Sequence, residues 1–297
     1  MNTLKDTIQY FVIISAELTV LFLGISTLVA LALMYIPQEK IKTYMSGNGL
    51  WDNALGAMIG ALTPFCACST IPMTLGFLEA GVSFGAIISF VIASPLLNPI
   101  ILTMLIALMG LRIAVVYFLI VFIGAVVSGL ILEKSGAAKL VKRVRIKGGI
   151  NTGNNNIPAK FIMKLKASFM LAWEDFKGVL IYLFIGVGIG AAIYGYMPQT
   201  LVLRYAGYDN IFAIPIAAII GIPLYIRAET AIPIGVALMQ KGMTVGAVFA
   251  LIIGGSGMAI PEMSMLAAIF KKRLVTAIVM VIFFTAVIGG YIFNIIF

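Results

Sequence analysis

The chain has 297 residues, of which 62% are hydrophobic and only 10% are charged, and its mean hydropathy is +1.13. Soluble domains are roughly half apolar and one quarter charged, so this composition excludes an ordinary soluble domain. The apolar runs reach the roughly 20 residues of a spanning helix and lack the alternation of an outer-membrane barrel. The sequence therefore predicts an all-α polytopic membrane protein.

The net charge of +9 does not indicate nucleic acid, because nine of the twenty Lys and Arg residues lie between Lys134 and Lys166, beside membrane segments. We expect membrane lipid and a small-molecule solute as partners, no nucleic acid and no cofactor, and nothing opposes a homo-oligomer. The two cysteines, Cys66 and Cys68, are one residue apart, which disfavours a disulfide between them. Histidine is absent, and with it the commonest general base and metal ligand.

Six long apolar segments are predicted to cross the membrane as helices. They are Ile8–Ile36, Val82–Met109, Ile113–Leu132, Gly178–Met197, Thr244–Phe270 and Leu274–Phe297. The first is too long for the apolar core of a signal peptide, and no small-residue cleavage site follows it, so we expect it to remain as a helix. Two further apolar regions, Leu50–Glu79 and Asn210–Gln240, are interrupted by prolines and are predicted to be broken helices or re-entrant hairpins.

The second half of the chain repeats the first at a constant offset of 161 residues. Ile71-Pro72 matches Ile232-Pro233, Gly81 matches Gly242, Gly85-Ala86 matches Gly246-Ala247, and the break at Ser94–Pro99 matches Gly254–Pro261. Chance similarity between apolar sequences is the alternative, and matched interruptions in both halves disfavour it. We predict a first membrane repeat over 1–132, a basic, Gly- and Asn-rich cytoplasmic linker over 133–166, and a second membrane repeat over 167–297.

The distribution of Lys and Arg predicts the direction of each half, because cytoplasmic loops collect these residues. With the linker inside, fifteen basic residues lie inside and four outside if both interrupted regions return to their starting side. If both regions instead cross the membrane, twelve basic residues lie inside and seven outside. The first arrangement is favoured, and it predicts two inverted-topology repeats, each with about three full spans plus a broken or re-entrant helix pair. We therefore expect a multi-pass protein of the cytoplasmic membrane.

The helix breaks should mark the interior, since unsatisfied peptide groups are tolerated at membrane depth only where protein or water covers them. Prolines that merely kink packed helices are the alternative. Cys66 and Cys68 lie in the first break, where nearby helix N-termini would favour thiolates and soft ligands, although buried cysteines often only pack. Ser69 and Thr70 are candidate substrate contacts whose simpler role is to cap the returning helix.

Ionisable residues at the breaks are further candidates, because charges within a membrane are costly. Arg227 and Glu229 match Cys66 and Cys68 at the repeat offset. They either pair as a structural bridge, or Arg227 holds an anionic substrate while Glu229 binds a cation or carries a proton. Glu262 and Glu229 are the proton-coupling candidates, with Glu17 in the first helix as another. A last candidate, which can both donate and accept hydrogen bonds at the opposing break, is Asn98.

Several motifs resemble those of the bacterial and archaeal ArsP-type permeases, which export trivalent organoarsenicals. The resemblance rests on Thr63–Pro72, Gly76–Val82, Ala93–Pro99, Gly221–Tyr225, Ile232-Pro233, Leu238–Gly242 and Pro261–Met263, and it covers both repeats. It implies that Cys66 and Cys68 bind As(III), as ligands of a soft metalloid only. The charged stretch Arg227–Thr230 departs from the small, uncharged stretch of those exporters.

The sequence thus predicts a secondary transporter, not an enzyme, that exports a thiophilic solute by alternating access. No Gly-x-x-x-x-Gly-Lys-Ser/Thr pattern occurs, so an ion or substrate gradient would drive active transport. Another soft metalloid, a metal complex or a sulfur-containing anion is the alternative substrate. A membrane thiol-disulfide oxidoreductase is the alternative from another class, and the absence of Cys-x-x-Cys spacing disfavours it. A scaffold role conflicts with ionisable residues at interrupted helices.

Overall fold

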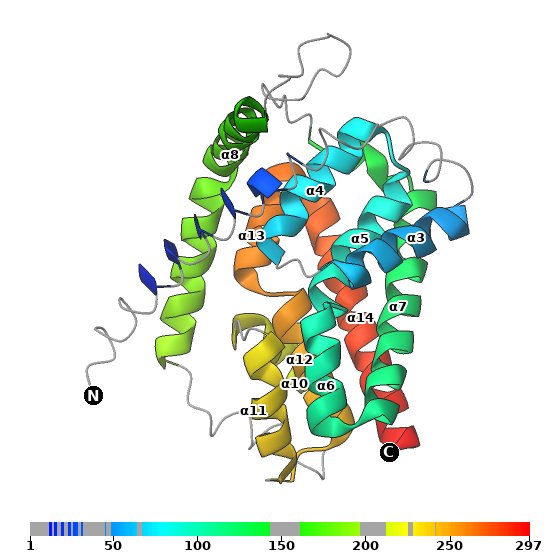
Figure 1. Ribbon diagram of the computed structural model, residues 1–297. Coiled ribbons are helices and arrows are strands. Elements are labelled where there is room, and N and C mark those ends of the chain that lie inside the picture. Colours follow the sequence, from blue (N-terminus) through cyan, green and yellow to red (C-terminus); the bar gives the residue numbers. More distant parts are fainter. Residues whose placement is uncertain are drawn as a thin grey trace.

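The computed structural model of the chain is a helical bundle (Figure 1). It describes residues 49–63, 67–142, 161–196, 212–224, 228–240 and 242–297, together with residues 12–13, 15–16, 19–20, 23–24, 26–28, 31 and 45. Regular structure within these ranges is helical, apart from the isolated bridge between Val141 and Phe270 and a bridge residue at Met243. The prediction of an all-α membrane protein is confirmed for this part of the chain.

The helices of the first half follow one another with short connections. They are α3 (Gly49–Leu62), α4 (Ala67–Ala80), α5 (Phe84–Leu96), α6 (Pro99–Met109), α7 (Leu111–Lys134) and a short 3₁₀ helix, η1 (Ala137–Leu140). Helix α8 (Phe161–Tyr196) begins the second half, so that helical structure covers the end of the predicted linker, residues 161–166. It is followed by α10 (Ala213–Leu224), α11 (Ala228–Gln240), α12 (Val245–Gly257), α13 (Ile260–Ile269) and α14 (Lys272–Ile296).

The two halves share one succession of helices at the offset of the sequence repeat. The first residues of α4, α5, α6 and α7 are related by this one offset to those of α11, α12, α13 and α14. Even the C-terminal caps agree: Gly81 and Gly242 have φ of 73° and 96°, a left-handed conformation that glycine adopts without strain. Each ends its helix in a Schellman motif, in which the next residue, Val82 or Met243, donates to a carbonyl five residues back.

Close helix packing is also the same in both halves, because glycine lets the backbones approach. A Cβ on Gly60 of α3 would lie 3.0 Å from the amide nitrogen of Ser94 in α5. At the equivalent crossing, a Cβ on Gly221 of α10 would lie 2.7 Å from the amide nitrogen of Gly255 in α12. Glycine at both crossings therefore allows α3 to pack on α5, and α10 to pack on α12.

Helices α7 and α14 lie side by side and run in opposite directions (Figure 1). At one end the guanidinium of Arg112, at the start of α7, lies 5.2 Å from the ring centroid of Phe297. At the other end, Lys271, which precedes α14, donates its amide to the carbonyl of Leu140 over 2.9 Å. The basic start of the linker and the basic turn before α14 therefore lie at the same end of the molecule.

Helices that are long and apolar enough to cross a membrane, alone or as bent pairs, occur in four of the six segments predicted to span it. Helices α7 and α14, with 24 and 25 residues, are each long and apolar enough to cross a membrane. The pairs α5–α6 and α12–α13 satisfy the same test as pairs, and each pair is bent by 42°. The described residues thus contain two such helices, or up to four spans if each bent pair is one. Most of the predicted first span lies outside the described residues.

Candidate functional site

The break between α5 and α6 is built by two prolines and an asparagine. Pro95 removes one backbone donor near the end of α5, and Pro99 occupies the first turn of α6, a position it favours. Asn98 caps α6: its side-chain oxygen accepts from the amide of Ile100 over 3.0 Å. This bond takes the amide that an unbroken helix would direct to the carbonyl of Leu96. Tyr117 of α7 donates its hydroxyl to that carbonyl over 3.0 Å.

The break between α12 and α13 has the same backbone pattern but a different polar side chain. Met258 donates to the carbonyl of Gly254 over 3.1 Å, and Met263 donates to that of Ala259 over 2.9 Å, as the equivalent residues do in the first half. Ala259 offers no side-chain cap. Instead Glu262 lies in the first turn of α13 and is 4% exposed. A carboxylate there is favoured by the positive end of the helix dipole.

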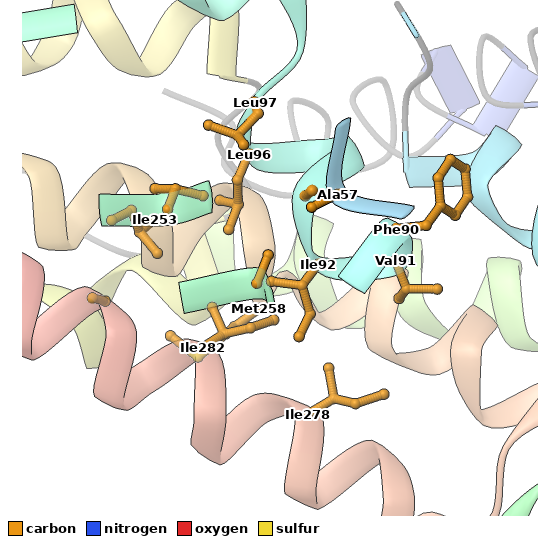
Figure 2. Close-up of a cluster of buried hydrophobic side chains, with 14 of the residues drawn as sticks. Ala57, Phe90, Val91, Ile92, Leu96, Leu97, Ile253, Met258, Ile278 and Ile282 are labelled. Carbon is orange, nitrogen blue, oxygen red and sulfur yellow. The ribbon is translucent and has the colours of Figure 1, made fainter. Parts of the chain in front are cut away.

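The two breaks meet in the centre of the molecule. A Cβ on Gly257, the last residue of α12, would lie 3.1 Å from Cδ2 of Leu96, the last residue of α5. Figure 2 shows Leu96 and Met258 in the same cluster as Ile253 and Ile282, and all four are nearly inaccessible to solvent. Side chains of both halves therefore close this point from opposite sides.

Helix α4 brings the first interrupted region to the same place. Thr70, in its first turn, is 1% exposed, and its Oγ1 lies 3.4 Å from Oγ of the fully buried Ser94 in the last turn of α5. Helix α4 also packs against α13, the helix that carries Glu262, and α11 packs against α6. Each interrupted helix thus contacts the second member of the bent pair from the other half. In Figure 1, α4 and α13 lie toward one end and α6 and α11 toward the other.

The structure describes the side chains of three of the predicted site residues. Thr70 lies at the last turn of α5, Asn98 lies at the break that follows, and Glu262 lies in the helix that α4 contacts. The backbones of Cys68 and Ser69 belong to the first turn of α4, and that of Glu229 belongs to the first turn of α11. The side chains of these three residues lie outside the described part, as do Glu17, Cys66 and Arg227 entirely.

The structure gives the side-chain oxygen of Asn98 a structural role as the cap of α6. Thr70 does not act as the N-terminal cap, because it is already the fourth residue of α4. Its hydroxyl faces Ser94, which places it at the contact between α4 and α5.

Two residues of this centre were not among the sequence candidates. Ser94 stands in the recognised break motif, and its position there was the available signal. Tyr117 contributes one polar atom, its hydroxyl oxygen, to the apolar run of α7, and no local sequence pattern distinguishes it. Within the described residues, no group of three or more His, Cys, Asp or Glu side chains could hold a metal ion.

Comparison with known proteins identifies a family. The model of a family described as a predicted permease, ArsP_1, matches residues 3–295. The chain belongs to this family. The resemblance predicted from the sequence motifs is thereby confirmed.

Three curated relatives cover most of the permease. UPF0718 protein YcgR of Bacillus subtilis is 26% identical over 84% of this chain and 85% of its own length. UPF0718 protein MJ0584 of Methanocaldococcus jannaschii is 25% identical over 79% and 80%, respectively. A Streptococcus mutans protein, named provisionally as a subunit of a two-component membrane permease complex, is 22% identical over 86% of each. No solved structure matches the permease.

Proposed function

We propose that the chain is a secondary transporter of the cytoplasmic membrane that exports a thiophilic solute, such as a trivalent organoarsenical, by alternating access. The observation that carries this proposal is the meeting of the α5 and α12 breaks, with Leu96 against Gly257. Interrupted helices that converge near the midplane are where transporters of inverted-repeat architecture bind substrate. Membership of a permease family supports the same class of function.

The two halves form an inverted repeat in this proposal. Its support is the offset that the helices of both halves share, together with the opposite directions of α7 and α14, which are equivalent helices. Reciprocal contacts add to it: α4 touches α13, and their counterparts α11 and α6 touch each other. A pseudo-two-fold axis generates such reciprocal pairs, as it does in a symmetric dimer. Rocking of one half against the other would then open the centre to either side.

The basic end is cytoplasmic in this proposal. Lys271 precedes α14 and bonds to the segment that follows α7, which joins two of the most basic parts of the chain at one face. A crossing of both interrupted regions would have separated them. Because cytoplasmic loops collect Lys and Arg, we assign this face to the cytoplasm.

Cys66 and Cys68 are the proposed ligands of the solute. Thiolates are soft ligands that suit trivalent arsenic, and Cys68 belongs to the first turn of α4, where a helix N-terminus favours a thiolate. Thr70 and the amide of Asn98 are the proposed polar contacts of the solute on the first half. Proton coupling is assigned to Glu262 or Glu229. The alternative role of Glu262 is to stabilise the N-terminus of α13.

Arg227 and Glu229 in the second interrupted region favour a second class of substrate. A cationic side chain there suits a sulfur-containing anion or a charged metal complex better than a neutral arsenical. The two alternatives differ in what the Arg227→Gln variant does. It abolishes transport of an anion and leaves transport of methylarsenite near the wild-type rate.

Uptake of methylarsenite into everted membrane vesicles tests the proposal. We expect the Cys66→Ser/Cys68→Ser double variant to lose energy-dependent uptake while it is inserted at the wild-type level. The matched control is Thr103→Val, which alters a hydroxyl on the exposed side of α6 and should not change uptake. Wild-type uptake by the double variant would remove the thiolate role.

A further inference from the structure

A group of buried polar atoms lies away from the breaks, at the basic end of the molecule. Asn53, in the first turn of α3, has 0% exposure, and neither its side-chain oxygen nor its nitrogen has a hydrogen-bond partner in the structure. The hydroxyl of Ser83, the N-cap of α5, is likewise buried and without a partner. Such groups normally bind protein, water or an ion, since leaving a buried polar group without a hydrogen bond is destabilising.

A carboxylate faces the same point. A Cβ on Gly85, in the first turn of α5, would lie 2.5 Å from Oδ1 of Asn53 and 2.5 Å from Oε2 of Glu133. The two oxygens therefore approach one point on α5 equally closely, and Nδ2 of Asn53 lies 2.9 Å from the same point. Glu133 comes from the last turn of α7, so α3 and α7 bring these polar atoms to the first turn of α5.

At the equivalent point in the second half, the polar side chains form hydrogen bonds with their neighbours. There Asn294 stands in place of Glu133, and its side-chain oxygen accepts from the amide of Gly246 over 2.8 Å. Its nitrogen lies 3.3 Å from the hydroxyl of Thr244, which caps α12. Ile214 takes the place of Asn53 and contributes no polar atom. The polar side chains at this point are thus hydrogen-bonded in the second half. In the first half, Glu133 and the buried amide of Asn53 have no hydrogen bond between them.

We propose that Asn53, Ser83 and Glu133 form a binding site for a small monovalent cation such as Na⁺. Oxygen atoms of amides, hydroxyls and carboxylates are the ligands that hard cations take. The positive end of the α5 dipole opposes a cation with about half a charge, whereas the Glu133 carboxylate contributes a full negative charge. A net negative site excludes an anion.

The site gives the transporter a second coupling ion besides the proton, and this role rests on the proposed function. Helix α5 joins the two places, since its first turn carries the cation ligands and its last turn contacts Thr70 and leads into the central break. Binding of a cation between α3, α5 and α7 would hold these helices together at the basic end. A cation gradient could therefore bias which end of the permease is closed.

Fluorescence of Trp51, two residues before Asn53, gives a local readout. The chain has two tryptophans, and the variant Trp173→Phe leaves Trp51 alone. The purified full-length permease is titrated in detergent with NaCl against choline chloride at constant ionic strength. We expect a saturable fluorescence change and a rise in melting temperature with Na⁺ only. Glu133→Gln should raise the half-saturating concentration about tenfold or more, since it removes the charged ligand.

Two further variants keep the test decisive. Asn53→Ile introduces the residue of the second half and should fold yet lose the Na⁺ response, whereas Thr244→Ala damages the opposite cap and should keep it. Equal responses to Na⁺ and choline in the wild type, as a bound water would give, overturn the proposal, and so does an unchanged response in Glu133→Gln. No solute is present, so failure here leaves the transport proposal standing, and failure of the cysteine test leaves this result standing.

Discussion

Alanine substitutions at the helix crossings should destabilise the permease in an order set by the geometry. A Cβ on Gly56 would lie 2.2 Å from the carbonyl oxygen of Ala86, well inside the 3.4 Å at which ordinary contact begins, so α3 and α5 would have to separate. At Gly221 the nearest backbone atom is 2.7 Å away, and at Gly60 it is 3.0 Å away. The required separation therefore decreases from Gly56 through Gly221 to Gly60.

Overpacking costs typically about 1–3 kcal/mol, while alanine gains up to about 1 kcal/mol over glycine inside a helix. Gly56→Ala should therefore lose the most stability, Gly221→Ala less, and Gly60→Ala least, close to neutral. Gly24→Ala is the control, because no atom lies within 4 Å of its Cβ position, and it should be neutral or stabilising.

Thermal unfolding of the purified variants, followed by the fraction that remains monodisperse after heating, measures this order. Each kcal/mol should shift the midpoint by about 2–4 °C, if soluble chains of roughly 150–250 residues are a guide. Equal midpoints for Gly56→Ala and Gly24→Ala would refute the close packing of α3 on α5, and with it the position of the first interrupted region.

Three other experiments test the hydrogen bond at the α5 break, the topology and the role of Glu262. Tyr117→Phe should cost about 1–3 kcal/mol of stability in the same melting assay, because it leaves the carbonyl at the α5 break without its donor, and wild-type melting would contradict that bond. In a background without native cysteines, a single cysteine in place of Lys139 or Lys272 should react with an impermeant maleimide in everted vesicles only. A single cysteine in place of Arg112 should react with it in intact spheroplasts only. Labelling of all three positions from one side would overturn the topology. Glu262→Gln should lose proton-driven uptake but keep solute counterflow if the carboxylate carries the proton, whereas a capping role predicts lower stability and unchanged coupling.

The sequence predicted the interruptions better than it predicted their contacts. Proline, glycine and asparagine act locally, so the breaks near Pro95 and Pro261 could be placed from the residues alone. The packing of Leu96 on Gly257 could not, because an apolar residue in a membrane helix faces lipid or protein with equal ease. The side-chain hydrogen bond of Tyr117 depends on that packing and gave no local signal.

Linker boundaries were also beyond the sequence. The Lys-rich stretch before Lys166 was predicted to be linker, and its last residues instead belong to α8, where alternating charged and apolar residues extend the helix. Of the candidate site, Thr70, Asn98 and Glu262 lie at or beside the breaks. The thiols and Arg227 remain predictions, since their side chains lie outside the described residues.

Flux through proteoliposomes that contain only this chain tests the central claim most directly. The permease is reconstituted, the vesicles are loaded with unlabelled methylarsenite, and counterflow of the labelled compound is followed in parallel with sulfite and thiosulfate. We predict saturable counterflow of methylarsenite that disappears in the Cys66→Ser/Cys68→Ser variant and persists in Thr103→Val. Counterflow no faster than in protein-free vesicles, for every solute tested, would contradict a permease that works through its interrupted helices.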